Sequence, residues 1–88
     1  MVIVRNAAAG TLESSDVMVE IGPSKGLQID IESTVLAQFG DALRRAVEEE
    51  LARLEVTDAA VRLSDRGALD CTVKARVETA VRRAAREA

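Results

Sequence analysis

The chain has 88 residues, enough for one small domain with a single compact core. It holds no histidine, one cysteine, one aromatic residue and 15 acidic against 12 basic side chains. This inventory excludes an internal disulfide and a histidine or thiolate metal cluster, removes the usual general base at neutral pH, and disfavours nucleic-acid binding. We therefore expect one domain over residues 1–88, with no metal and no catalytic residues of its own.

The first 13 residues are expected to lead up to a loop that contains two adjacent serines. Residues 2–4 could add an edge strand, and the small residues 7–10 look like a connector. No apolar run approaches the roughly 18 residues that span a bilayer. The start of the chain also lacks a basic leader, so we expect a cytoplasmic protein that does not enter membranes.

Two segments then alternate apolar and polar residues, which is typical of half-buried strands. They cover residues 16–21 and 27–32, and residues 22–26 between them are rich in turn formers. The pair is therefore predicted to form an antiparallel hairpin. The next segment has the period of an amphipathic helix, with an apolar stripe made of Leu36, Phe39, Leu43, Val47, Leu51 and Leu54.

The last third of the chain predicts two further strands and a second helix. Residues 61–64 and 69–73 alternate again around a turn at residues 65–67, and from about residue 74 the period is helical. The helical stripe consists of Val73, Val77, Ala80, Val81 and Ala84. The expected fold is α+β: a β-β-α-β-β-α two-layer sandwich with a four-stranded, mainly antiparallel sheet and both helices on one face.

Few residues in this pattern suggest chemistry. Ser14 and Ser15 precede a strand, where serines commonly satisfy loop backbone groups or initiate a turn. If they take part in chemistry, they do so as acceptors of a modification, because no histidine is present to activate a hydroxyl. Cys71 is expected to be a buried apolar residue of the fourth strand, and Asp70 to stabilise a turn.

Two groups of charged residues are further candidates for a functional surface. Asp30 and Glu32 are expected to form a solvated acidic patch with Glu20 or Asp16 across the hairpin. The second group could be a solvated helix face, or a docking patch for an acidic partner or for phosphates. It consists of Arg76, Arg82, Arg83 and Arg86.

Three segments, in order, resemble the acyl carrier subunit (gamma chain) of bacterial citrate lyase. They are residues 9–16 (AGTLESSD), 38–41 (QFGD) and 66–71 (RGALDC). The resemblance implies that Ser14, or Ser15 as second choice, carries covalent 2'-(5''-phosphoribosyl)-3'-dephospho-CoA through a phosphodiester. The thiol of this group would hold acetyl and citryl thioesters.

The same resemblance implies three partners: the alpha (acyl transferase) and beta (lyase) subunits of citrate lyase and a prosthetic-group transferase. Three alternatives stay open at this point. They are the acyl carrier subunit of malonate decarboxylase, a non-catalytic interaction domain without cofactor, and a small-molecule-binding domain, which the lack of aromatic residues disfavours.

Overall fold

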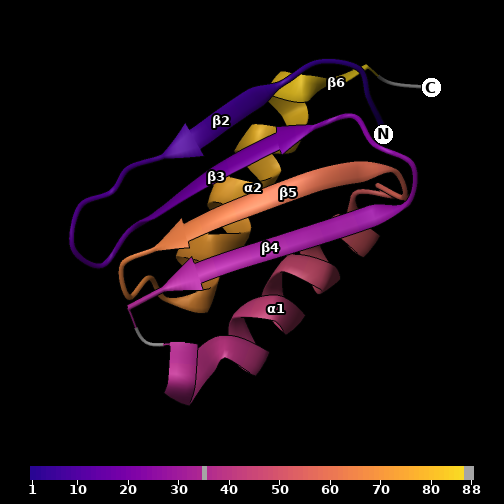
Figure 1. Ribbon diagram of the computed structural model, residues 1–88. Helices are drawn as coiled ribbons and strands as arrows, with labels where there is room; N and C mark the ends of the chain where they lie inside the picture. Colours follow the sequence, from indigo (N-terminus) through magenta and orange to yellow (C-terminus); the bar gives the residue numbers. More distant parts are fainter. Residues whose placement is uncertain (35, 87–88) are drawn as a thin grey trace.

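The computed structural model describes residues 1–34 and 36–86, with the side chains of residues 36–39 outside that description. A four-stranded sheet forms one layer and two helices cover one of its faces (Figure 1). The elements are β1 (Val2–Ile3), β2 (Ala7–Gly10), β3 (Val17–Gly22), β4 (Leu27–Ser33), α1 (Leu36–Arg53), β5 (Ala59–Asp65), α2 (Asp70–Ala84) and β6 (Ala85–Arg86). The predicted α+β class, with two helices on a four-stranded and mainly antiparallel sheet, is confirmed.

The strand order is β2-β3-β5-β4, and this order corrects the predicted hairpin. β3 and β4 follow each other in the chain but do not pair, because β5 lies between them, antiparallel to β3 and parallel to β4. The four residues that join β3 to β4 have only to span two strand spacings, roughly 10 Å. β4, α1 and β5 thus form a β-α-β unit. The periodicity of the sequence does not reveal that its two strands are parallel.

The predicted strand at residues 69–73 is wrong, since α2 begins at Asp70. Three alternating apolar residues fit the first turn of a helix as well as a strand. The fourth strand is instead β2, the segment expected to be a connector. Alanine and glycine are poor strand formers, but here they pair with β3 and leave room for α2, against which Ala9 is buried.

Residues 2–4 do not extend the main sheet as predicted. Val2 and Ile3 pair with Arg86 and Ala85 in a separate two-stranded sheet, which closes the two ends of the described chain against each other. Within the described residues, no helix combines the length and the apolar character that crossing a membrane requires.

The core lies between the sheet and the helices. The inward residues of β3 and β5 are buried, as are those of the two predicted helical stripes that the structure describes. These comprise Val17, Val19, Ile21, Ala59, Val61, Leu63, Leu43, Val47, Leu51, Leu54, Val73, Val77, Ala80, Val81 and Ala84. The predicted burial of Leu36 and Phe39 concerns side chains outside the described part.

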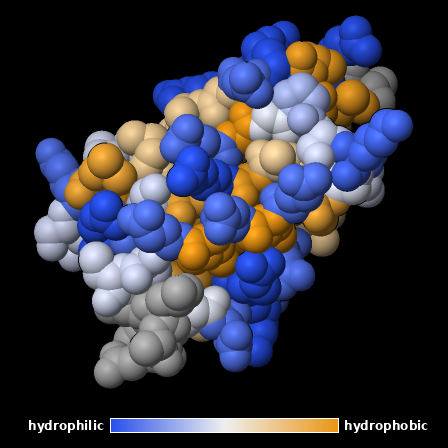
Figure 2. Space-filling model, in the orientation of Figure 1, coloured by the Kyte–Doolittle hydropathy of each residue, from blue (hydrophilic) through white to orange (hydrophobic). Residues whose placement is uncertain are grey.

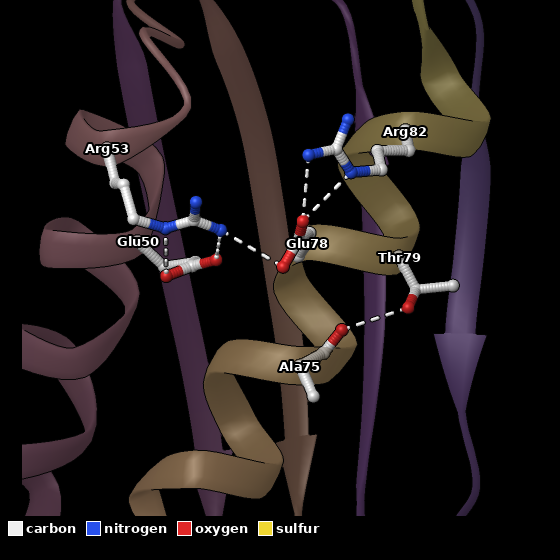
Figure 3. Close-up of polar contacts among 6 residues, drawn as sticks. All are labelled: Glu50, Arg53, Ala75, Glu78, Thr79 and Arg82. Carbon is white, nitrogen blue, oxygen red and sulfur yellow. Dashed lines mark hydrogen bonds and ion pairs between the residues drawn. The ribbon is translucent and has the colours of Figure 1, made fainter.

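The two helices are also joined at the surface (Figure 3). Arg53 pairs with Glu50 on its own helix and reaches Glu78 of α2 at 3.0 Å, and Arg82 pairs with Glu78 at 2.8 Å. The network links the last turns of α1 to the middle of α2. The opposite face of the sheet is not covered by any described element, and it mixes hydrophilic and hydrophobic surface (Figure 2).

Candidate functional site

The two serines lie in the loop that connects β2 to β3, at one end of the sheet. β4 and β5 also end there, and both helices begin there (Figure 1). The loop enters through Gly10, whose φ of +102° suits glycine. A Cβ at this position would lie 1.8 Å from the carbonyl oxygen of Val17. The sharp exit from β2 therefore requires glycine.

The two serines occupy different positions in a β-turn and make different contacts. The N–H of Asp16 donates to the carbonyl of Glu13 at 3.1 Å, so Ser14 and Ser15 occupy the two central positions. Ser15 has a φ of +65°, and its N–H donates to the carbonyl of Arg66 at 2.8 Å. Both serines are exposed, and the Ser14 hydroxyl forms no hydrogen bond with any residue that the structure describes.

Asp16 fastens this turn to α2. Its carboxylate accepts two hydrogen bonds from the Arg76 guanidinium, at 3.1 and 3.0 Å, and others from the Thr11 hydroxyl at 2.6 Å and from the N–H of Val17 at 2.8 Å. The hydrogen bonds from Arg76, followed by those from Thr11 and Val17, lower the pKa of Asp16 from 3.8 to about 2. A carboxylate this acidic and this fully bonded is a poor proton acceptor at neutral pH.

The turn is fastened a second time, to the loop that follows β5. Arg66 accepts from the N–H of Ser15, and its own N–H donates to the carbonyl of Asp16 at 2.9 Å. The backbone around the serines is thus held from two sides, while the Ser14 side chain is left free. Sequence reasoning located the serines but missed both supports, because Arg66 and Arg76 lie more than 50 residues away along the chain.

The structure also corrects the expectations for two neighbours of this site. Cys71 is exposed on the first turn of α2, not buried in a strand. Asp70 is the first residue of the same helix and is exposed, where its negative charge complements the helix dipole. Neither side chain makes a hydrogen bond or an ion pair within the described part of the chain.

The predicted acidic patch is divided by a cation. Because β5 lies between β3 and β4, Arg62 stands between Glu20 and Asp30 on the open face of the sheet. These three residues line a shallow depression of about 690 Å³ at the end of the sheet away from the serine turn. Among the described residues, no group of three or more potential metal ligands is present.

Three of the four C-terminal arginines already have partners inside the domain. Arg76 binds Asp16, Arg82 binds Glu78, and Arg83 donates to the carbonyl of Ala8 at 2.8 Å. Arg86 is exposed in β6. The role of these arginines in docking stays a prediction.

Comparisons with known proteins find one matching family model and several relatives of about 50% identity. A family model described as malonate decarboxylase delta subunit (MdcD) matches residues 4–84. Citrate lyase acyl carrier protein of Cronobacter sakazakii is 54% identical over 85 residues, which cover 96% of this chain and 88% of that protein. The protein of the same name from Treponema denticola is 51% identical over 84 residues, covering 96% and 97%. That from Streptococcus mutans is 52% identical over 87 residues, covering 97% and 85%.

A solved structure shares the fold. The chain matches one in the crystal structure of a Pseudomonas malonate decarboxylase hetero-tetramer in complex with malonate, with a TM-score of 0.73 and 21% identity. The match covers 92% of this chain and 84% of the other. At this identity the likeness concerns the fold alone, whereas the relatives of about 50% identity cover nearly the whole chain. This chain belongs to the citrate lyase acyl carrier protein family.

Proposed function

We propose that this chain, as a single carrier domain over residues 1–88, is the acyl carrier subunit of citrate lyase, with Ser14 as the attachment site. The name shared by its relatives supports the class of function. The observation that supports the site is the free, exposed hydroxyl of Ser14 on a backbone held by Asp16 and Arg66.

The geometry of the turn favours Ser14 over Ser15. Ser14 is the first central residue of the β-turn and no described residue bonds its hydroxyl. Ser15, in contrast, shapes the turn through its backbone, which has a φ of +65° and donates a hydrogen bond to the carbonyl of Arg66. A modifying enzyme would reach the Ser14 oxygen without breaking a contact of this side chain.

The group expected on Ser14 is 2'-(5''-phosphoribosyl)-3'-dephospho-CoA. When bound, it supplies a thiol on a flexible arm that carries acyl groups as thioesters. In this step the Ser14 oxygen bonds to phosphorus of an activated phosphoryl donor held by the modifying enzyme, the bond from that phosphorus to its leaving group breaks, and the hydroxyl proton passes to a base. Asp16 lies two residues from Ser14 in the sequence, but its lowered pKa and its partners make it unsuitable to accept that proton. The chain also has no histidine, and we assign the base to the modifying enzyme.

The proposal includes three partners: the prosthetic-group transferase, and the alpha and beta subunits of citrate lyase. The carrier holds the acyl group at high effective concentration beside each catalyst and supplies positioning, not acid–base chemistry. We place this complex in the cytoplasm.

The test is to produce the chain with its modifying enzymes and to combine intact-mass measurement with peptide mapping. We expect one adduct on Ser14, no adduct and no citrate cleavage for Ser14→Ala, and a nearly normal adduct for Ser15→Ala. An unmodified chain in an active citrate lyase complex would refute carrier function. An adduct confined to Ser15 would refute the site.

The acyl carrier subunit of malonate decarboxylase is the second candidate, favoured by the description of the matching family model and by the shared fold. Reconstitution separates the two. The modified chain should restore citrate cleavage to citrate lyase subunits and should fail to restore malonate decarboxylation to the other set.

A further inference from the structure

One buried charge remains without a role in the site described so far. Asp65 is the last residue of β5 and is fully buried. The inward positions that precede it on this strand, Ala59, Val61 and Leu63, are all apolar and belong to the core. A carboxylate at the next inward position costs desolvation energy that an aliphatic residue would not. Hydrogen bonds to the Asp65 carboxylate must offset this cost.

The Asp65 carboxylate bonds to three donors at the serine end of the domain. Oδ2 accepts from the Ser33 hydroxyl at 2.7 Å and from the N–H of Gly67 at 3.1 Å, and Oδ1 accepts from the N–H of Ala68 at 3.0 Å. Bonds to the second and third following N–H groups are how aspartate shapes a turn. Gly67, with a φ of +88°, completes the sharp bend into α2.

The residue enclosed by this turn is Arg66, which holds the serine turn through its backbone. Its carbonyl binds the N–H of Ser15 at 2.8 Å and its N–H binds the carbonyl of Asp16 at 2.9 Å. The Asp65 carboxylate bonds Ser33, Gly67 and Ala68 and not Ser14, so its effect on the serine passes through Arg66.

We propose that Asp65 is a positioning residue for Ser14: its buried carboxylate shapes the loop of residues 66–68, whose Arg66 backbone fixes the turn that presents the serine to the modifying enzyme. The proposal rests on the proposed function only in assigning the modified oxygen to Ser14. The coupling between the two turns can be measured without any modification.

The experiment compares the wild-type chain with Asp65→Ala, Asp65→Asn and the control Val47→Ala. Val47 is a fully buried residue of α1, so its truncation weakens the fold away from the serine turn. Two quantities are measured: amide hydrogen exchange of Ser15 and Arg66 relative to amides in the middle of β3 and β5, and the kcat and KM of prosthetic-group transfer.

For Asp65→Ala we expect the Ser15 and Arg66 amides to exchange at least about tenfold faster relative to the sheet. We also expect kcat for transfer to fall at least about tenfold with little change in KM, because the Ser14 hydroxyl oxygen would be misaligned for the reaction but would stay accessible to the enzyme. Asp65→Asn should give values between those of wild type and Asp65→Ala, because Gly67 and Ala68 bond different oxygens of the carboxylate and the amide has only one acceptor oxygen. Val47→Ala should lower stability without either effect.

Unchanged exchange at Ser15 and Arg66 in Asp65→Ala would overturn the proposal, as would a kcat reduced equally in Val47→Ala. If Asp65→Ala does not fold, Asp65→Ser serves in its place, because a serine hydroxyl shapes such turns more weakly than aspartate. A folded Asp65→Ser chain with wild-type exchange and transfer would overturn it too. If no chain is modified, the proposed function fails, while the exchange data still decide whether Asp65 controls the serine turn.

Discussion

The pair formed by Asp16 and Arg76 gives the most direct prediction about the serine turn. Replacing Arg76 by methionine keeps most of the aliphatic stem and removes both hydrogen bonds to the carboxylate. The pKa of Asp16 falls from 3.8 to about 2, so all its partners together stabilise the folded chain by at most about 2.4 kcal/mol at neutral pH. The Arg76 side chain is 39% exposed, and solvent screening reduces its part to about 1 kcal/mol.

The dependence on pH follows from the direction of the shift. A carboxyl group whose pKa is lowered by folding adds stability above its unfolded value, near 3.8, and this stability is lost as the pH falls toward about 2. The difference between wild type and Arg76→Met should therefore be full at pH 6–7 and fall to roughly a third of that value at pH 2. Urea denaturation at several pH values measures it.

A double-mutant cycle with Asp16→Asn completes the test. We expect a coupling energy of about 1 kcal/mol at pH 7, whereas Arg82→Met, which breaks an exposed pair on the same helix, should change the stability much less. A difference between wild type and Arg76→Met that is the same at pH 2 and pH 7 would contradict the electrostatic argument. So would a coupling energy of zero.

Three further predictions concern single positions at the same end of the domain. Gly10→Ala should destabilise the fold by about 2–4 kcal/mol in thermal or urea unfolding, because its Cβ meets the carbonyl of Val17 and its φ is positive; a neutral effect would show that the loop can rearrange. Ser15→Gly should raise the stability by up to about 1 kcal/mol and leave attachment at Ser14 intact, because glycine relieves the positive φ; a loss of stability would mean that the Ser15 side chain is needed. Cys71 should react with a thiol reagent in the native state at the rate of an exposed thiol; a thiol protected until unfolding would support the strand that the sequence suggested.

Local patterns predicted those parts of the fold that local physics determines. Periodicity of two and of 3.6 residues located β3, β4, β5, α1 and most of α2, and the apolar faces then required two layers. The insertion of β5 between β3 and β4 depends on a pairing of segments far apart in the chain. The alternation of residues 69–73 was too short to separate a strand from the start of a helix, and β2 lacks the residues that mark a strand.

The candidate functional site, like the fold, could be predicted from the sequence only where it depends on neighbouring residues. The motif around Ser14 could be recognised in the sequence, but its supports are not local. Arg76 lies 60 residues from Asp16 and reaches it because α2 packs against β2 and β3, the strands on either side of the serine loop. The sequence predicted Asp65 as part of a turn, since aspartate followed by arginine and glycine is typical of one. Its burial becomes apparent only when β5 is known to be an interior strand.

If Ser14 is the attachment site as proposed, the contacts around it explain how this domain would affect the rate of a reaction that another enzyme catalyses. A catalytic serine needs a base within the same protein, whereas a serine that receives a group needs only to fit the base of another enzyme. That requirement demands a fixed backbone and a free side chain, which is what Asp16, Arg66 and the unbonded hydroxyl of Ser14 provide. Loosening either support should therefore slow the attachment of the prosthetic group. In the proposed carrier the attached thiol would lie at the end of a flexible arm, so the same substitutions should have much less effect on acyl transfer.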